Sequence, residues 1–341
     1  MVSCAIFDRI SLPSQVEIAA VKFLYVAIGL LLLQCLPAVA EDQNCMNDYY
    51  RTRIPACVDA VLSQFGQPVP GTTSEPSAVV GFLAQIFITS STEKQRILSS
   101  ASTVFVKWVD LLALQRAGLT EDARKFADEN RLAAVLQRLE SNHRPPLAEV
   151  RPLSIPADND LLIGAYMASG DTGFIERILG NFSSLDDSSA SDALRMGLMT
   201  SKFGPTFTPK GRENVMSPAS CAKYQCKADP AKFLRLLTAS SAFWALQSLA
   251  QRDDGIRKTF SGFFARDARL KNLLAAEQAA FGNYIAALAM SAAFKPDQVS
   301  PEGRQTYEAM SKAASAYENL EPAQIVFSYI EPLAKSGKPQ K

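Results

Sequence analysis

Hydrophobic residues recur every three or four positions along most of the chain, with polar residues between them. In residues 42–65, for example, Val58, Val61, Leu62 and Phe65 follow this spacing. Such a period places the apolar side chains on one face of an α-helix. The same pattern predicts helices over 42–65, 77–90, 92–117, 120–140, 159–169, 172–182, 189–200, 230–251, 267–293, 301–318 and 320–335. No stretch alternates apolar and polar residues as a half-buried strand does, so we expect an all-α fold of stacked antiparallel hairpins without significant sheet.

Proline and glycine interrupt the helical pattern at three places. Residues 66–76 form a loop, and four prolines make 144–157 an extended connector. Residues 201–229 combine glycines, prolines and two cysteines in an irregular loop, which is either a recognition element or a cover for the core. These breaks predict an N-terminal helical lobe over 41–143, the connector 144–157, a C-terminal helical lobe over 158–335 and a solvated tail over 336–341.

The first forty residues carry an export pattern. Lys22 precedes the apolar run 23–33, and Ala38-Val39-Ala40 follows shortly afterwards. A positive charge, an apolar core and a small-x-small motif are typical of a secretory signal peptide. We expect a leader over residues 1–40, cleavage after Ala40, and a periplasmic or secreted protein. Residues 1–20 do not resemble a leader, which points to a true start near Val21. An uncleaved leader is the alternative, since 21–40 are barely long enough to span a bilayer and would then attach the protein to the membrane.

Four cysteines lie downstream of the leader: Cys45, Cys57, Cys221 and Cys226. In an oxidising compartment they favour disulfides, and proximity in sequence favours the pairs Cys45–Cys57 and Cys221–Cys226. The alternative is a zinc site. Because the spacings match no familiar zinc pattern, we expect no metal.

The segment Ala168-Ser169-Gly170-Asp171-Thr172-Gly173-Phe174 contains the tripeptide that carries the catalytic carboxylate of aspartic proteases. Those enzymes need two such loops, so that two carboxylates share a proton, and only one is present here. The flanks are helical instead. We therefore expect Gly170 to end one helix in a left-handed conformation, and Asp171 or Thr172 to cap the next. Similar capping roles are expected for the other acidic residues near predicted helix starts, such as Asp158 and Asp186.

A related hairpin lies upstream, where Gly118 occupies the position of Gly170. The two glycines are 52 residues apart, and their alignment pairs Ala113 with Ala165, Leu114 with Tyr166, and Phe126 with Ile178. Together these segments resemble the helix-turn-helix unit of tetratricopeptide-like repeats, with Leu162, Tyr166 and Gly170 at the family's Leu, Tyr and Gly positions. Ala123 matches the small residue of the second helix, whereas Ile175 replaces it downstream. The resemblance covers about 45 residues and implies hairpin stacking only, because the family's period is about 34 residues. With the leader, the chain is similar to exported helical proteins of bacterial envelopes.

Composition narrows the chemistry that the chain can perform. The 35 Lys and Arg nearly balance the 34 Asp and Glu, which gives no reason to expect a nucleic-acid partner. His143 is the single histidine, so mechanisms that need two histidines are excluded. No G-x-S-x-G, Walker or dinucleotide-binding glycine motif is present, and we expect no cofactor. The basic and aromatic residues 256–266 indicate either an interfacial helix or, as we expect, a helix with phenylalanines in the core and cations in water.

These observations favour an exported, non-catalytic binding or assembly module of a bacterial cell envelope. Stacked hairpins commonly bind proteins or peptides through a concave face. Tyr166, Phe243 and Trp244 are candidate binding residues, although such apolar stripes also form helical cores.

Two alternatives remain open. One is a hydrolase that uses paired carboxylates on an envelope polymer, with Asp160, Asp171 and Glu277 as candidates. It requires at least two acids in one cleft. The other is a structural protein tethered to the membrane by an uncleaved leader.

Overall fold

The computed structural model describes residues 40–65, 76–142, 144–151, 155–203, 230–293 and 300–318. Several predictions fall outside these ranges: most of the leader, the predicted helix 320–335, His143, and the cysteines Cys221 and Cys226. Most of the loop 201–229 and the tail 336–341 also lie outside them.

The described residues form α-helices and no strand, which confirms the all-α fold. The helices are α2 (Ala40–Thr52), α3 (Pro55–Phe65), α4 (Ser77–Thr89), α5 (Ser91–Ser100), α6 (Val104–Arg116), α7 (Thr120–Glu129), α8 (Ala133–Ser141), α9 (Pro156–Ser169), α10 (Gly173–Ser183), α11 (Asp187–Phe203), α14 (Pro230–Ala250), α15 (Asp254–Arg266), α16 (Ala268–Ala293) and α17 (Pro301–Glu318).

Three expected helices are each divided into two, and the helical period alone did not reveal the breaks. Between α2 and α3 the chain turns at Arg53, whose φ is 52°, and Pro55 opens the next helix. Thr103 starts α6 by accepting a hydrogen bond on its side chain from the Val106 amide. Arg131 separates α7 from α8 with a φ of 59°. In each case the apolar period continues across the break, because both short helices face the same core.

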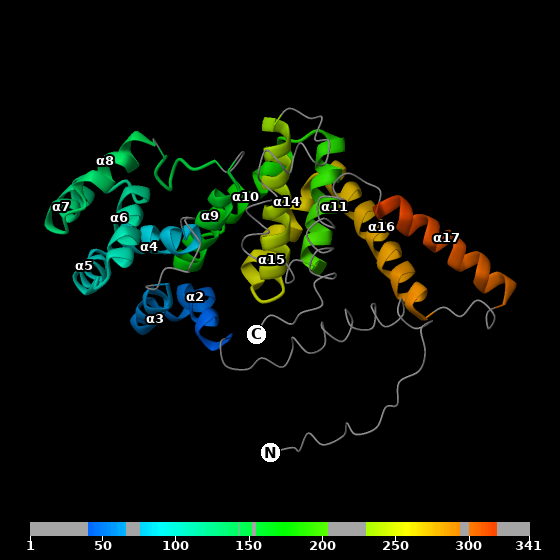
Figure 1. Cartoon of the computed structure of the whole chain (residues 1–341), viewed down its shortest axis with the longest axis horizontal. Coiled ribbons are helices and arrows are strands. Elements are labelled where there is room, and N and C mark those ends of the chain that lie inside the picture. The colour runs from blue at the N-terminus through cyan, green and yellow to red at the C-terminus, as the bar shows by residue number, and fades with distance from the viewer. Residues whose placement is uncertain are drawn as a thin grey trace, which may run out of the picture.

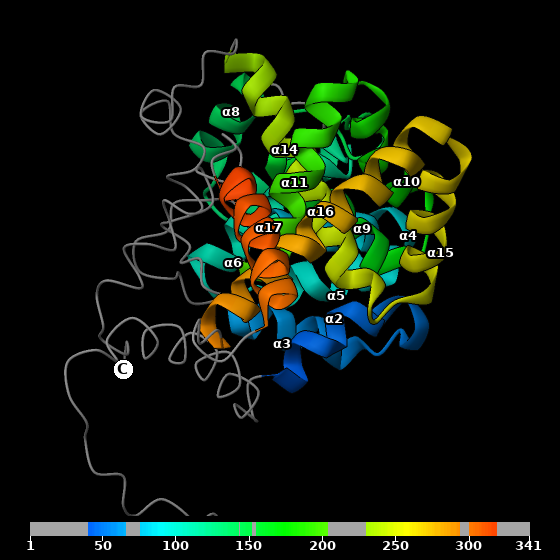
Figure 2. The same cartoon turned by 90° about the vertical axis from the view of Figure 1, so that its right-hand side faces the viewer.

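The helices follow one another through space much as they do along the chain (Figure 1). Helices α5 to α8 lie at one end, α4, α9 and α10 in the middle, and α11, α14 and α15 next to them. The hairpin α16–α17 forms the opposite end, which faces the viewer in Figure 2. The blue pair α2–α3 lies on one side of this array, against α4 and α9.

Helices α4 and α9 cross at van der Waals distance between their backbones. A Cβ added to Gly81 would lie 1.9 Å from the Leu161 carbonyl oxygen, and one added to Gly164 would lie 1.9 Å from that of Ala78. Only glycine permits such an approach. Because α4 precedes the proline-rich connector and α9 follows it, this crossing joins the two sides of the connector.

The two glycine turns identified in the sequence have the predicted conformation. Gly118 has a φ of 74° after α6, and Gly170 has a φ of 75° after α9. The Gly170 amide donates to the Tyr166 carbonyl, and the Leu119 amide donates to that of Leu114. Both glycines therefore end a helix in the left-handed conformation and start a hairpin, α6–α7 or α9–α10.

The connector lies against the core along the part that the structure describes. Leu147 and Val150 are fully buried. Arginines hold its backbone: Arg116 donates to the Pro145 carbonyl at 2.6 Å, and Arg177 donates to that of Leu147 at 2.8 Å. The segment is not extended throughout: residues 147–149 form a turn in which the Glu149 amide donates to the Pro146 carbonyl at 2.9 Å. The two arginines hold this segment against the core.

Candidate functional site

The turn that contains the Asp-Thr-Gly tripeptide is the docking point of α2. The Tyr50 ring lies against Gly170, where an added Cβ would come within 2.5 Å of it. Arg53 donates to the carbonyls of Ala168 at 2.6 Å and Ser169 at 3.4 Å. These carbonyls end α9, where the helix dipole favours a cation. Asp171 is exposed and accepts a hydrogen bond at 2.9 Å from the amide of Gly173, the first residue of α10. The N-cap itself is Thr172, whose side chain makes no capping hydrogen bond.

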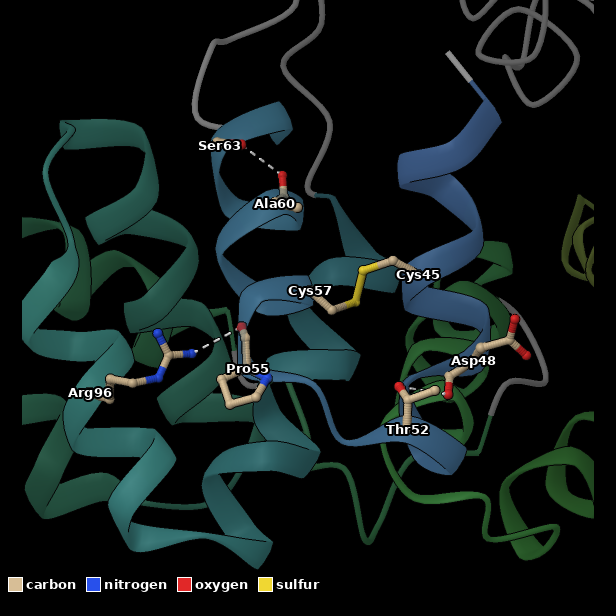
Figure 3. Close-up of a disulfide and its surroundings, with 8 residues drawn as sticks. All are labelled: Cys45, Asp48, Thr52, Pro55, Cys57, Ala60, Ser63 and Arg96. Carbon is tan, nitrogen blue, oxygen red and sulfur yellow. Dashed lines mark hydrogen bonds between the residues drawn. A yellow bond between two sulfur atoms is a disulfide. The ribbon is translucent and has the colours of Figure 1, made fainter. Parts of the chain in front are cut away.

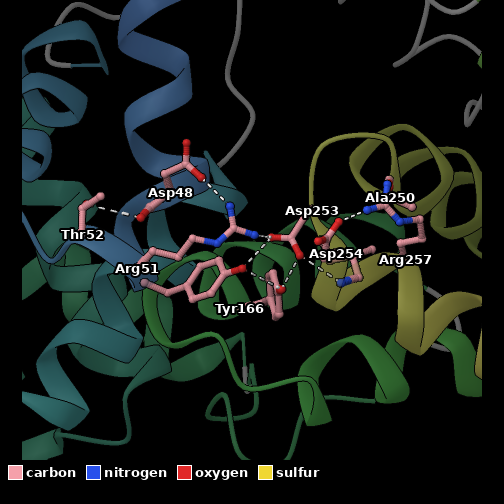
Figure 4. Close-up of polar contacts among 10 residues, drawn as sticks. Asp48, Arg51, Thr52, Tyr166, Ala250, Asp253, Asp254 and Arg257 are labelled. Atoms are coloured by element: carbon pink, nitrogen blue, oxygen red, sulfur yellow. Dashed lines mark hydrogen bonds and ion pairs between the residues drawn. The ribbon is translucent and has the colours of Figure 1, made fainter.

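Asp253 receives side chains from two other helices. Its Oδ1 accepts hydrogen bonds from the Tyr166 hydroxyl at 2.8 Å and from the Ile256 amide at 3.0 Å, which caps α15. Its Oδ2 accepts one from the Tyr50 hydroxyl at 3.0 Å and lies 3.5 Å from the Arg51 guanidinium. Figure 4 shows Arg51 and Tyr166 converging on this carboxylate. We call the group the α2 clamp; its members are Tyr50, Arg51, Arg53, Tyr166 and Asp253.

Electrostatics fix the protonation states of the clamp. Burial alone raises the pKa of the Asp253 carboxyl, but the donors around it outweigh that effect, so the pKa lies below its ordinary value. For Tyr166, burial together with the hydrogen bonds to Tyr50 and Asp253 raises the pKa of the hydroxyl. At neutral pH Asp253 is therefore an anion that accepts, and Tyr166 is a neutral donor.

A small pocket of about 50 Å³ lies beside the clamp. Its walls are mostly apolar and come from three segments that are distant in sequence: Asn47 and Asp48 on α2, Tyr166 and Met167 on α9, and Leu249, Arg252, Asp253 and Ile256 around the start of α15. This volume holds one or two water molecules or the end of one side chain.

The rim of the pocket carries polar groups that remain available. Among the described residues, the side chains of Asn47 and Arg252 have no hydrogen-bond or ion-pair partner, and Arg252 is exposed. Asp48 is bonded to Arg51 at 2.9 Å. A ligand at this rim therefore meets an amide donor and acceptor and a guanidinium above an apolar floor.

The structure brings only one of the three candidate binding residues to this site. Tyr166 belongs to the clamp and is 1% exposed. Phe243 is fully buried and packs among Phe182, Phe260 and Phe264. Its neighbour Trp244 is partly exposed. Phe243 is thus a core residue, as the alternative interpretation of its apolar stripe implied.

The three candidate catalytic acids do not meet. Asp160 is exposed in the first turns of α9, and Asp171 is exposed beyond its far end, about 16 Å away along the helix. Glu277 is buried in α16, and both of its oxygens are occupied: Ser191 donates to one at 2.5 Å and Arg195 to the other at 2.7 Å. Glu277 therefore ties α16 to α11, and no pair of these acids shares a cleft.

Sequence reasoning missed most of the clamp. Asp253 alone has a local signal, because an aspartate just before a helix and three residues before Ile256 is a capping pattern. For residues 256–266, we expected a helix with apolar residues in the core and cations in water. In the structure Ile256 and Phe264 are buried, whereas Arg257 and Lys258 are exposed. No local signal marks Tyr50 or Arg53, because their partners lie more than 100 residues away.

Two further properties concern the described part of the chain. No three His, Cys, Asp or Glu side chains gather there in a group that would hold a metal ion. None of its helices combines the length and apolar character needed to cross a membrane.

The chain was compared with protein-family models, curated proteins and solved structures, and it matches none of them.

Proposed function

We propose that the protein is an exported, non-catalytic binding or assembly module of a bacterial cell envelope, and that the pocket beside the α2 clamp contacts a protein or peptide partner. The pocket is the main observation that supports this proposal. Its apolar floor suits one aliphatic side chain of a partner. The free amide of Asn47 and the guanidinium of Arg252 suit the polar backbone next to that side chain.

The disulfide supports export. Cys45 and Cys57 are bonded, with their Cα atoms 5.6 Å apart, as the sequence predicted for an oxidising compartment. The predicted leader ends five residues before Cys45. The predicted leader and the disulfide depend on different residues, and both indicate an oxidising compartment outside the cytoplasm.

The geometry favours this function over the hydrolase, and a mass measurement distinguishes it from the tethered protein. A carboxylate-dependent hydrolase needs two acids in one cleft, and Asp160, Asp171 and Glu277 are apart. A tethered structural protein needs an attached leader. The intact mass of the protein isolated from its host decides this point: a chain that begins at Glu41 contradicts tethering, and a chain that keeps the leader contradicts a cleaved exported module.

Site-specific photocrosslinking tests the proposed contact. A photoreactive amino acid replaces Asn47 or Arg252 at the rim, and in a control variant it replaces Lys125, which is exposed on α7. In cells, we expect the two rim variants to capture the same envelope protein, and the control variant not to capture it. Filling the pocket with Leu249→Trp should abolish the capture. If the control captures the same protein equally well, or if Leu249→Trp leaves capture intact, the pocket is not the contact.

A further inference from the structure

The disulfide joins the helix that carries the clamp to the helix that follows it. Figure 3 shows Cys45 on α2 bonded to Cys57 on α3. Cys57 is buried at 6% exposure, whereas Cys45 is partly exposed. Between them the chain reverses at Arg53, a residue of the clamp. The bond therefore closes a short loop that contains every clamp residue of α2.

Helix α3 is anchored independently of the clamp. Val58, Val61 and Leu62 are buried in the core. In addition, Arg96 of α5 donates to the Asp59 carboxylate at 2.6 Å. It also donates to the Pro55 carbonyl at 3.4 Å, a contact that Figure 3 shows. Through the disulfide, α2 shares this anchor.

Helix α2 has fewer anchors of its own. Tyr49 is buried against Phe82, with ring centroids 5.0 Å apart. Cys45 and Met46 also pack, partly buried, against the core. The remaining connections are the clamp contacts of Tyr50, Arg51 and Arg53. Polar contacts of this kind are individually weak compared with a covalent bond. With the disulfide intact, α2 leaves the array only if α3 moves as well. Without the disulfide, α2 is held only by its own packing against the core and by the clamp contacts.

We propose that the Cys45–Cys57 disulfide is a redox-controlled lock on the α2 clamp. Reduction releases α2 from the turn at Gly170 and from Asp253. The pocket then loses the wall formed by Asn47 and Asp48, so its floor on α9 and α15 opens to solvent. The lock itself follows from the anchoring of α2 and α3; only its use, control of partner binding, rests on the proposed function.

The reductant is a dithiol, the chemical class that reduces disulfides in exported proteins. A thiolate of the dithiol attacks Sγ of Cys45, the more exposed residue of the pair, and a mixed disulfide forms while Cys57 leaves as a thiolate and takes up a proton. The second thiol of the reductant then attacks the mixed disulfide and releases Cys45, which is also protonated. Two electrons and two protons reach the protein, and the reductant becomes a disulfide.

Hydrogen-exchange mass spectrometry tests the lock. The full chain keeps only Cys45 and Cys57, with its other four cysteines replaced by serine. Exchange is measured before and after reduction with dithiothreitol. We expect the amides of α2 to exchange at least about tenfold faster after reduction, because the loop constraint is lost. Helix α7, at the far end of the array, serves as the internal control and should exchange at an unchanged rate.

Two results would overturn the lock: unchanged exchange in α2, or equal acceleration in α2 and α7, which means general loss of stability. A Cys45→Ser/Cys57→Ser chain should reproduce the reduced state without any reductant. If that chain does not fold, the reduced two-cysteine chain still gives the measurement. If α2 opens but crosslinking from Arg252 is unaffected by reduction, the lock stands and the proposed binding site is wrong.

Discussion

Asp110 lies in an environment that disfavours its charge. It is fully buried in α6, and within the described part of the chain neither of its carboxylate oxygens has a hydrogen-bond partner. Burial raises the pKa of this carboxyl to about 8. An acid in such a place is neutral at pH 7, so α6 keeps a protonated carboxylic acid in its apolar face.

Stability should therefore fall as the pH rises. The folded chain holds the Asp110 proton up to about pH 8, whereas the unfolded chain loses it near pH 4. The contribution of the Asp110 carboxyl to the free energy of unfolding is thus complete below pH 4 and declines progressively up to pH 8. Asp110→Asn should remove this decline and make the protein about 2–5 kcal/mol more stable than wild type at pH 9. Urea unfolding from pH 4 to pH 9 measures the free energy of unfolding of wild type and variant.

Asp160→Asn, at an exposed site, is the control. Parallel pH profiles for wild type and Asp110→Asn would contradict the assignment.

Asp253 is the residue on which the clamp depends. Asp253→Ala removes the cap of α15 and the acceptor of two tyrosine hydroxyls, one of which, on Tyr166, is buried. We expect a loss of about 2–4 kcal/mol in the free energy of unfolding. The neighbouring Asp254→Ala is a matched control, because Asp254 is exposed and pairs with Arg257 on the surface. Its expected cost is below about 1 kcal/mol. Thermal unfolding of both variants makes the comparison, and equal losses would rule out a special role for Asp253.

At the scale of elements, the crossing of α4 over α9 determines how the array is built. Substitution of Gly81 by alanine places a methyl group on a carbonyl of the facing backbone. Backbone cannot rotate away as a side chain does, so the helices must separate. We expect Gly81→Ala to destabilise the protein by about 3 kcal/mol or more.

A matched variant isolates this clash from general glycine effects. A Cβ added to Gly180, within α10, meets no atom within 4 Å. Gly180→Ala should therefore stabilise the protein by about 0.5–1 kcal/mol through higher helix propensity. Urea denaturation of the two variants shows the difference in sign. A mild effect of Gly81→Ala would mean that α4 and α9 do not cross so closely.

At the scale of the whole molecule, α4 and α9 connect the predicted N-terminal and C-terminal lobes. Both helices bury residues almost completely, including Phe82 and Leu83 on α4 and Leu161 and Ala165 on α9. If the chain is cut at the connector, each fragment exposes one side of this interface. The boundaries of the lobes, 41–143 and 158–335, remain predictions.

We expect the fragments 41–151 and 156–341 to fold poorly when separate and to associate when produced together. Circular dichroism and size-exclusion chromatography of each fragment and of their mixture test this. Lower helicity or aggregation of the single fragments, restored by mixing, is the expected result. A fragment 156–341 that is fully helical and unfolds sharply alone would show instead that the lobes are independent.

The local features of this protein were readable in the sequence. Helical periodicity predicted the all-α class, and glycines at 118 and 170 predicted the left-handed ends of α6 and α9. The disulfide between Cys45 and Cys57 followed from their separation of twelve residues. These features depend on the intrinsic preferences of neighbouring residues, so a short window of sequence contains what decides them.

Tertiary structure alone decided the rest. Tyr50 and Asp253 are 203 residues apart, and Arg53 and Ala168 are 115 apart, so no local pattern joins them. The glycines of the α4–α9 crossing look like ordinary interior helix glycines until the facing backbone is known, and Asp110 looks like an ordinary surface acid until its face of α6 is buried. Packing brings distant segments together, and a carboxylate acts as a cap, a clamp or a buried acid according to what then surrounds it.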